Sequence, residues 1–111
     1  MLSEQEFRVK SDEALGDARQ KLLTLADQAG FEVELQNGVL DLVFEEPRES
    51  KFVVSPNAPV RQIWVSAHSR SFKLDWDAAR ESFILPGTGQ TLNAFIEDAI
   101  STHLGESVTL G

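Results

Sequence analysis

The chain has 111 residues, no cysteine, and 18 acidic against 10 basic residues, which gives a formal net charge of −8. The length suits one domain with a modest core, and the lack of cysteine excludes disulfides, thiolate metal sites and cysteine nucleophiles. The charge argues against nucleic acid and anionic membranes as partners, because phosphate binding needs clustered Lys and Arg, and it favours cations or basic protein surfaces.

Two further classes are disfavoured by the pattern of the chain. No run of residues is long and apolar enough to span a membrane, and the first residues lack the apolar core and cleavage site of a targeting segment. We therefore expect one cytoplasmic domain over residues 1–111.

The first segment has the spacing of a long helix over residues 3–29. Gly30 follows it and is a good stop signal. The apolar positions recur three, four or seven residues apart, and they are Phe7, Ala14, Ala18, Leu22, Leu25 and Ala29.

The next segment, FEVELQNGVLDLVFE, changes to a period of two and predicts a β-hairpin. Asn37-Gly38 is the preferred two-residue type I′ turn. That turn sets the register, so that Gln36 faces Val39, Leu35 faces Leu40, Glu34 faces Asp41, Val33 faces Leu42, Glu32 faces Val43 and Phe31 faces Phe44. The apolar pairs then share one side and the acidic residues the other.

Four more strands and a second helix complete the pattern. The strand segments are SKFVVS, VRQIWVS, SFKLDW and ESFILP, and a helix begins after Thr91, a plausible N-cap. Alternating Val108 and Leu110 in the tail can pack against the helices. The order helix–strands–helix predicts an α+β fold, a two-layer sandwich with two helices on one face of an antiparallel sheet of about six strands.

One tryptophan falls on the face that should meet water. Ile63 and Val65 alternate onto the core side of their strand, which leaves Gln62, Trp64 and Ser66 on the open side. Trp is enriched at binding hot spots, and we favour a partner-binding surface.

The next strand can add to that surface, because Lys73 lies on its outer face. The alternative is that a neighbouring side chain such as Arg61 or Arg80 covers the ring of Trp64. Trp76 instead shares the inward phase with Phe72 and Leu74 and is expected in the core.

Glu34 opposite Asp41 is the most informative charged pair. Like charges directly opposed across a hairpin destabilise it, and a hard cation would reverse that repulsion. The alternative is a solvated acidic face. His68 and His103 lack ligand spacing and are expected to be structural. No nucleophile or phosphate-loop motif points to catalysis, so we expect no enzymatic activity.

These segments together resemble the frataxin family, in its bacterial iron-donor (CyaY) branch. The resemblance rests on the long helix, the acidic hairpin with NGVL, the stretch PVRQIWVSAHSRSFKLDW, the turn PGTGQTL and the closing helix. It implies a frataxin-like fold, weak surface binding of Fe²⁺ for which other divalent or trivalent cations can substitute, and contact with the cysteine desulfurase and scaffold protein of iron–sulfur cluster assembly. It also implies a monomer in the absence of iron.

The resemblance places Asp12, Glu32 and Glu34 at acidic positions of the family. With Asp27 and Asp41 they are the candidate metal ligands, and the candidate partner-binding residues, taken from the strand phase, are Gln62, Trp64, Ser66 and Lys73. The chain departs from the family's acidic ridge at ARQKLLTLADQ, where Asp27 is the one acid, whereas Asp41 adds an acid to the hairpin.

Three hypotheses follow. The first is an iron-binding accessory protein of cluster assembly that docks on the desulfurase–scaffold complex as iron donor, regulator, or both. The second is a pure protein-interaction modulator of the desulfurase with incidental metal binding, which the thinned helix ridge slightly favours. The third, a ferroxidase, has the least support.

Overall fold

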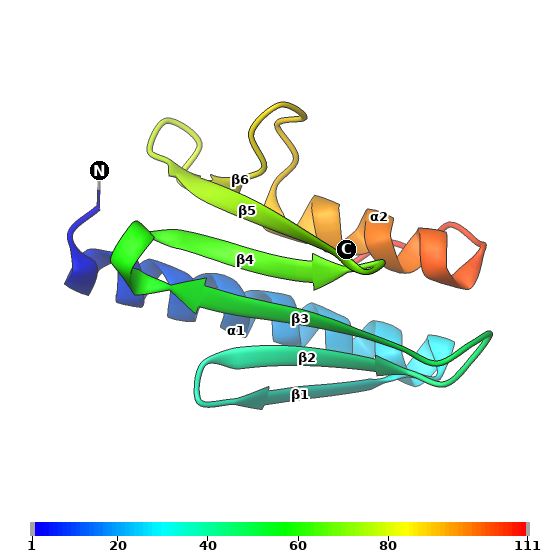
Figure 1. Ribbon diagram of the computed structural model, residues 1–111. Helices are drawn as coiled ribbons and strands as arrows, with labels where there is room; N and C mark the ends of the chain where they lie inside the picture. The colour runs from blue at the N-terminus through cyan, green and yellow to red at the C-terminus, as the bar shows by residue number, and fades with distance from the viewer. Residues whose placement is uncertain (1, 111) are drawn as a thin grey trace.

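The computed structural model describes residues 2–110 and has two layers, with a six-stranded antiparallel sheet in one and two helices in the other (Figure 1). The sheet has the strand order β1-β2-β3-β4-β5-β6, and both helices lie on the same side of it. The elements are α1 (Glu4–Ala29), β1 (Glu32–Gln36), β2 (Val39–Phe44), β3 (Ser50–Asn57), the short 3₁₀ helix η1 (Ala58–Val60), β4 (Gln62–Ala67), β5 (Arg70–Asp77), β6 (Ser82–Ile84) and α2 (Leu92–Leu104). The predicted fold class is confirmed. Within residues 2–110 no helix combines the length and apolarity needed to cross a membrane.

Both ends of α1 follow from local sequence. Ser3 and Glu6 form a reciprocal capping box at its start, and Gly30 adopts a left-handed conformation, φ 80°, at its end. The buried stripe differs from the predicted one, because Ser11 and Leu15 are buried while Ala14 is half-buried. Ser11 can enter the stripe because its hydroxyl donates to the carbonyl of Arg8 at 3.2 Å, which satisfies a polar group that sequence patterns place outside.

The β1–β2 hairpin has the predicted register. Asn37 and Gly38 have φ values of 53° and 78°, as a type I′ turn requires, and Glu34 lies opposite Asp41. Phe31 precedes β1, yet its ring lies 4.7 Å from that of Phe44. The pairing is therefore set by the turn and by one shared apolar side.

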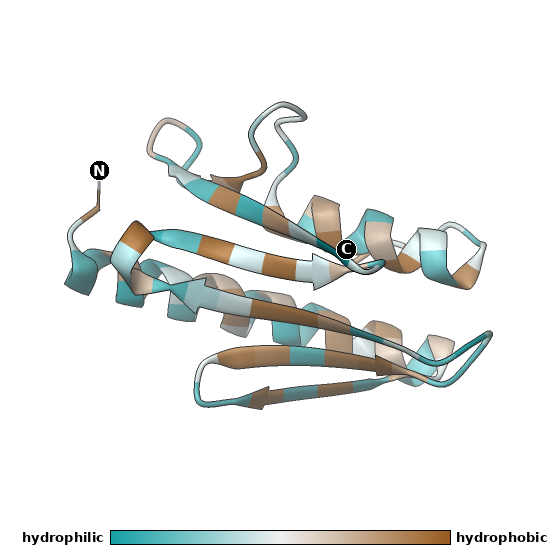
Figure 2. Ribbon diagram, viewed as in Figure 1, coloured by the Kyte–Doolittle hydropathy of each residue, from teal (hydrophilic) through white to brown (hydrophobic). Residues whose placement is uncertain are grey.

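The rest of the sheet alternates between core and open faces. Hydrophobic and hydrophilic residues alternate along several strands in Figure 2, and β4 buries Ile63, Val65 and Ala67 while Trp64 remains 36% exposed. The β4–β5 turn is made by His68 and Ser69, which both have positive φ.

The second helix and the tail close the core. Thr91 caps α2 as predicted, and α2 buries one apolar stripe, which consists of Leu92, Phe95, Ile96, Ala99 and Ile100. The tail packs on α2, because the backbone N–H of Leu110 donates to Glu97 Oε2 at 2.9 Å and that of Val108 donates to Ser101 Oγ at 3.1 Å. Trp76 is half-buried rather than fully in the core, since it lies at the margin of the helical layer.

His103 belongs to the buried side of α2, with only 2% of its surface exposed. Its ring packs on Phe44 with a centroid distance of 4.5 Å. Neither ring nitrogen has a hydrogen-bond partner among residues 2–110. Burial lowers the pKa of His103 and the positive charge of Arg48 adds to the shift, against a smaller opposing effect of the nearby backbone of Glu46 and Arg48. The expected structural role therefore takes the form of a neutral imidazole in the core.

Candidate functional site

Trp64 is held in one orientation on the open face of the sheet. Its indole Nε1–H donates to Gln62 Oε1 at 3.0 Å, and Gln62 Nε2 donates to Asp75 Oδ1 at 2.9 Å. The ammonium of Lys73, the register partner of Trp64, lies 4.9 Å from the ring centroid, within cation–π range. We call Gln62, Trp64, Lys73 and Asp75 the Trp64 relay.

The four predicted partner-binding residues lie together on this face. Gln62, Trp64 and Ser66 come from β4, and Lys73 lies on the neighbouring β5. Neither of the two arginines considered as a cover for Trp64 lies on its ring. Arg61 Nη1 donates to the carbonyl of Ala58 at 2.6 Å, and Arg80 Nη1 donates to the carbonyl of Gly89 at 3.0 Å.

Sequence reasoning missed the role of Asp75, although the alternation along its strand places Asp75 on the same face as Lys73. It shares the outward phase of β5, but its pairing with Gln62 depends on the β4–β5 register. Because the indole N–H is satisfied internally, the surface that Trp64 offers to a partner is its apolar ring. An immobilised aromatic ring loses little conformational entropy on binding.

We expect Asp75→Ala to loosen the indole without removing it. Gln62 would lose the acceptor that fixes its amide, so the Trp64 indole N–H resonance should shift, and binding to a partner on this face should weaken by about threefold, less than for removal of the ring. Two-dimensional NMR and a binding titration measure the two effects. The control is Ser71→Ala on the same strand and face, outside the relay, and equal behaviour of the two variants would contradict a positioning role.

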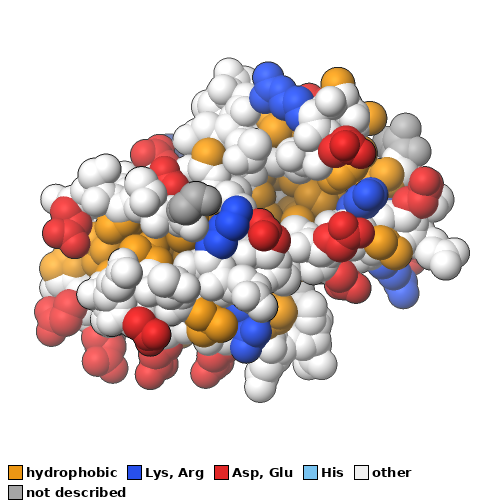
Figure 3. Space-filling model, turned by 180° about the vertical axis from the view of Figure 1, so that it is seen from behind, with side chains coloured by type: hydrophobic (Ala, Val, Ile, Leu, Met, Phe, Trp, Pro, Cys, Tyr) orange, Lys and Arg blue, Asp and Glu red, His pale blue; other side chains and the backbone are white. Residues whose placement is uncertain are grey.

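The candidate metal ligands are spread over three elements. Asp12 and Asp27 are exposed on α1, Glu32 and Glu34 are exposed on β1, and Asp41 is half-buried on β2. Within residues 2–110, no three His, Asp or Glu side chains form a group that could hold a metal ion. Figure 3 shows a row of acidic side chains along the lower left edge of the helical face.

Only Glu34 and Asp41 are brought directly opposite each other. The Lys51 ammonium lies 3.7 Å from Asp41 Oδ2, an interaction that sequence analysis did not include and that competes with any added cation. Glu34 and Asp41 have no third protein ligand beside them, so they do not enclose an ion. Such a pair suits a weakly held cation that prefers oxygen ligands and keeps most of its bound water.

We expect Glu34→Gln to raise the free energy of unfolding in metal-free buffer by a few tenths of a kcal/mol, because it removes the repulsion from Asp41. The same change should reduce the stabilisation gained from added Mn²⁺ or Fe²⁺, since a ligand of the folded state stabilises it. Thermal melts with and without metal measure both. Glu32→Gln is the control, because its opposite residue is Val43, and equal metal-induced shifts in all three proteins would remove the pair from any cation site.

Comparisons with known proteins identify the family and the fold. The family model described as a frataxin-like domain matches residues 1–106. The chain is 29% identical to the iron-sulfur cluster assembly protein CyaY of Azotobacter vinelandii, over 86% of this chain and 87% of that protein. It is 35% identical to the protein of the same name from Pseudomonas aeruginosa, over 74% and 76%.

A solved structure supports the same fold. The frataxin of Psychromonas ingrahamii, studied for stability within the CyaY family, superposes with a TM-score of 0.77 at 20% identity, covering 99% of each chain. The architecture of residues 2–110 and the family match over residues 1–106 therefore both indicate a frataxin-like domain. The chain belongs to the frataxin-like family, in its bacterial CyaY branch.

Proposed function

We propose that the protein is an accessory factor of iron–sulfur cluster assembly that docks on the cysteine desulfurase–scaffold complex through the Trp64 relay. Relatives that carry the name iron-sulfur cluster assembly protein support the process. The observation that carries the docking is a large aromatic side chain, 36% exposed on the open face of the sheet. It is fixed by a hydrogen bond to Gln62 on its own strand and by the ammonium of Lys73 on the next strand. Aromatic anchors of this kind dominate protein interfaces.

Iron enters this proposal as cargo. Fe²⁺ would bind weakly to surface carboxylates, with Glu34 and Asp41 as the pair held closest by the fold. The net charge of −8 raises the local concentration of cations and orients basic protein surfaces toward the chain. The negative charge of the chain and the Trp64 relay would thus act on one complex, the charge through long-range attraction and the relay through direct contact.

A second candidate is a modulator of the desulfurase for which iron is incidental. The ion pair between Asp41 and Lys51, at 3.7 Å, favours it, because that pair already neutralises one of the two opposed carboxylates. Among residues 2–110 no group of three His, Asp or Glu side chains could hold a metal ion, so no observation favours a ferroxidase.

Reconstituted cluster assembly distinguishes the candidates. Purified desulfurase and scaffold are run with this protein, first with iron limiting and then with iron in excess, and both cluster formation and sulfur transfer are followed. A donor changes the rate of cluster formation most when iron is scarce, whereas a regulator changes the rate of sulfur transfer in both conditions. No effect in either condition would overturn the proposed function.

A further inference from the structure

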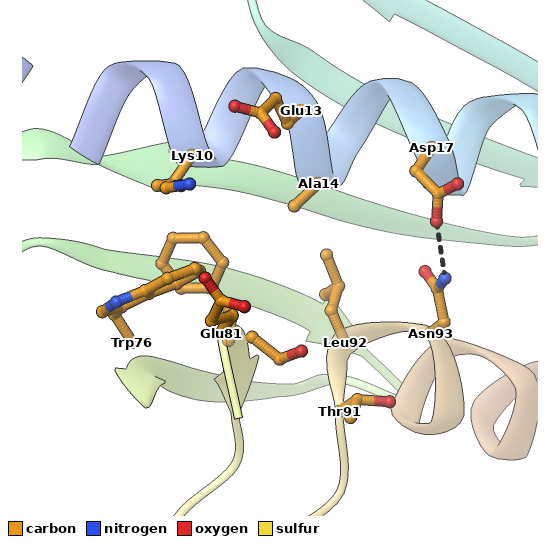
Figure 4. Close-up of a pocket in the computed structure, with 11 residues that line it drawn as sticks. Lys10, Glu13, Ala14, Asp17, Trp76, Glu81, Thr91, Leu92 and Asn93 are labelled. Atoms are coloured by element: carbon orange, nitrogen blue, oxygen red, sulfur yellow. Dashed lines mark hydrogen bonds between the residues drawn. The ribbon is translucent and has the colours of Figure 1, made fainter. Parts of the chain in front are cut away.

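A cavity of about 280 Å³ lies in the helical layer, on the opposite side of the sheet from Trp64. It is open to solvent on one side and is lined by the first half of α1, the strands β5 and β6 with their turn, and the start of α2 (Figure 4). Its lining combines apolar side chains, which are Ala14, Phe83, Leu92 and the half-buried ring of Trp76, with the polar side chains of Ser82, Thr91 and Asn93. Figure 3 shows hydrophobic side chains on the floors of hollows in this face, with charged side chains beside them.

The rim of the cavity is negatively charged. Glu13 and Asp17 project from α1 and Glu81 from the turn beside Trp76, against one ammonium, that of Lys10. Asp17 is engaged, because Asn93 Nδ2 donates to it at 3.1 Å and the Lys21 ammonium lies 3.4 Å away.

Two of the rim carboxylates remain available to a ligand. Within residues 2–110, Glu13 and Glu81 have neither an ion pair within 4.0 Å nor a side-chain hydrogen bond. They approach the same end of the cavity from opposite walls, where Trp76 also lies.

The chain itself places a cation at this end. The Lys10 ammonium lies 5.7 Å from the centroid of the Trp76 ring, within the range of a cation–π contact. Lys10 has a flexible four-carbon stem and makes no ion pair within 4.0 Å among the residues described. Its side chain can therefore leave the ring when a more suitable cation arrives.

We propose that this cavity binds a linear aliphatic diamine. One ammonium would take the place of Lys10 over Trp76, between Glu13 and Glu81, the methylene chain would cover Leu92, and the second ammonium would reach toward Asp17. The volume is close to the lower end of small-ligand sites, and three carboxylates on the rim repel anions. This site is separate from the Trp64 relay and independent of the function proposed above.

Fluorescence of Trp76 provides the test. The chain has two tryptophans, so Trp64→Phe leaves Trp76 as the single reporter, and 1,4-diaminobutane is titrated at constant ionic strength. We expect a saturable change in emission, and none with 1,4-butanediol, which has the same length without charge. A change that does not saturate, or that equal ionic strength of sodium chloride reproduces, would overturn the proposal.

Three variants in the same background sharpen the result. Glu13→Gln with Glu81→Gln should weaken binding by about tenfold, and Lys10→Met should tighten it by about threefold because it removes the internal competitor. The matched control is Glu45→Gln with Glu106→Gln, two exposed acids that do not line the cavity. Equal weakening by both double variants would reduce the effect to net charge and refute the site, as would weaker binding by Lys10→Met.

Discussion

Replacing Trp64 with alanine should weaken binding to the desulfurase–scaffold complex by about 2 kcal/mol, or roughly thirtyfold, while the fold remains intact. The side chain is 36% exposed, so its removal opens no core cavity. The variant loses the indole hydrogen bond to Gln62 and the contact with the Lys73 ammonium, which are surface interactions. A fully buried tryptophan would instead cost about 3–5 kcal/mol of stability.

A melting curve and a binding titration separate these effects. Trp64→Phe keeps an aromatic ring without the indole N–H, so it should bind with intermediate affinity. Val9→Ala provides the control, because Val9 is an exposed apolar side chain, 52% accessible, on α1. A folded Trp64→Ala protein with parental affinity for both partners would refute the docking surface.

Replacing His103 with leucine should stabilise the protein by about 1–2 kcal/mol at neutral pH. The imidazole is 2% exposed and packs on Phe44 and Phe52. Neither of its nitrogens has a hydrogen-bond partner among residues 2–110, and a buried unsatisfied polar group costs about 1–3 kcal/mol. Leucine fills a similar volume without polar atoms. Urea unfolding measures the change, and a loss of stability would show that the imidazole has partners in solution.

The same residue should make stability depend on pH. Burial, with a smaller contribution from Arg48 and His68, lowers the pKa of His103 in the folded state. The unfolded chain then binds a proton below pH about 6.5 that the folded chain does not. The contribution of neutral His103 is therefore complete above pH about 6.5 and is lost as the pH falls toward the folded pKa, with a slope of at most about 1.4 kcal/mol per pH unit.

Comparison of variants between pH 7 and 5.5 isolates this effect. His103→Leu should flatten the slope, because the carboxylates that remain titrate mostly at lower pH. His68→Asn should retain most of the parental slope, because burial is the largest cause of the lowered pKa of His103 and His68 contributes less. Asparagine also tolerates the positive φ of 53° at this exposed position. Equal slopes in all three proteins would exclude His103 as the titrating group.

Local rules determined much of this structure before any tertiary contact was considered. The helix boundaries follow from Ser3, Gly30 and Thr91, whose capping interactions join residues close in sequence. The β1–β2 register follows from Asn37-Gly38, because a two-residue turn leaves one pairing. The outward position of Trp64 follows from the period of two along β4, since neighbouring side chains of a strand point to opposite faces.

Other features depend on pairings between residues far apart in the chain. The contact of Gln62 with Asp75 and that of Lys51 with Asp41 each join two strands, and the sequence alone does not give their register. The burial of His103 depends on Phe44 of β2 and Phe52 of β3, which are far from α2 in the chain. A periodic pattern specifies which face of an element is apolar, whereas packing between layers decides how deeply each position is covered.

The candidate sites show the same division. Composition and alternation indicated an acidic hairpin and an exposed tryptophan, because charge and strand phase are local properties of the chain. Only the tertiary structure decided that Trp64 is fixed by a hydrogen-bonded relay and that the five candidate metal ligands form no group of three within residues 2–110. It also created the cavity beside Trp76, because that space exists only where α1, β6 and α2 meet, and the distances between such elements are set by the packed core and not by the sequence of any one of them.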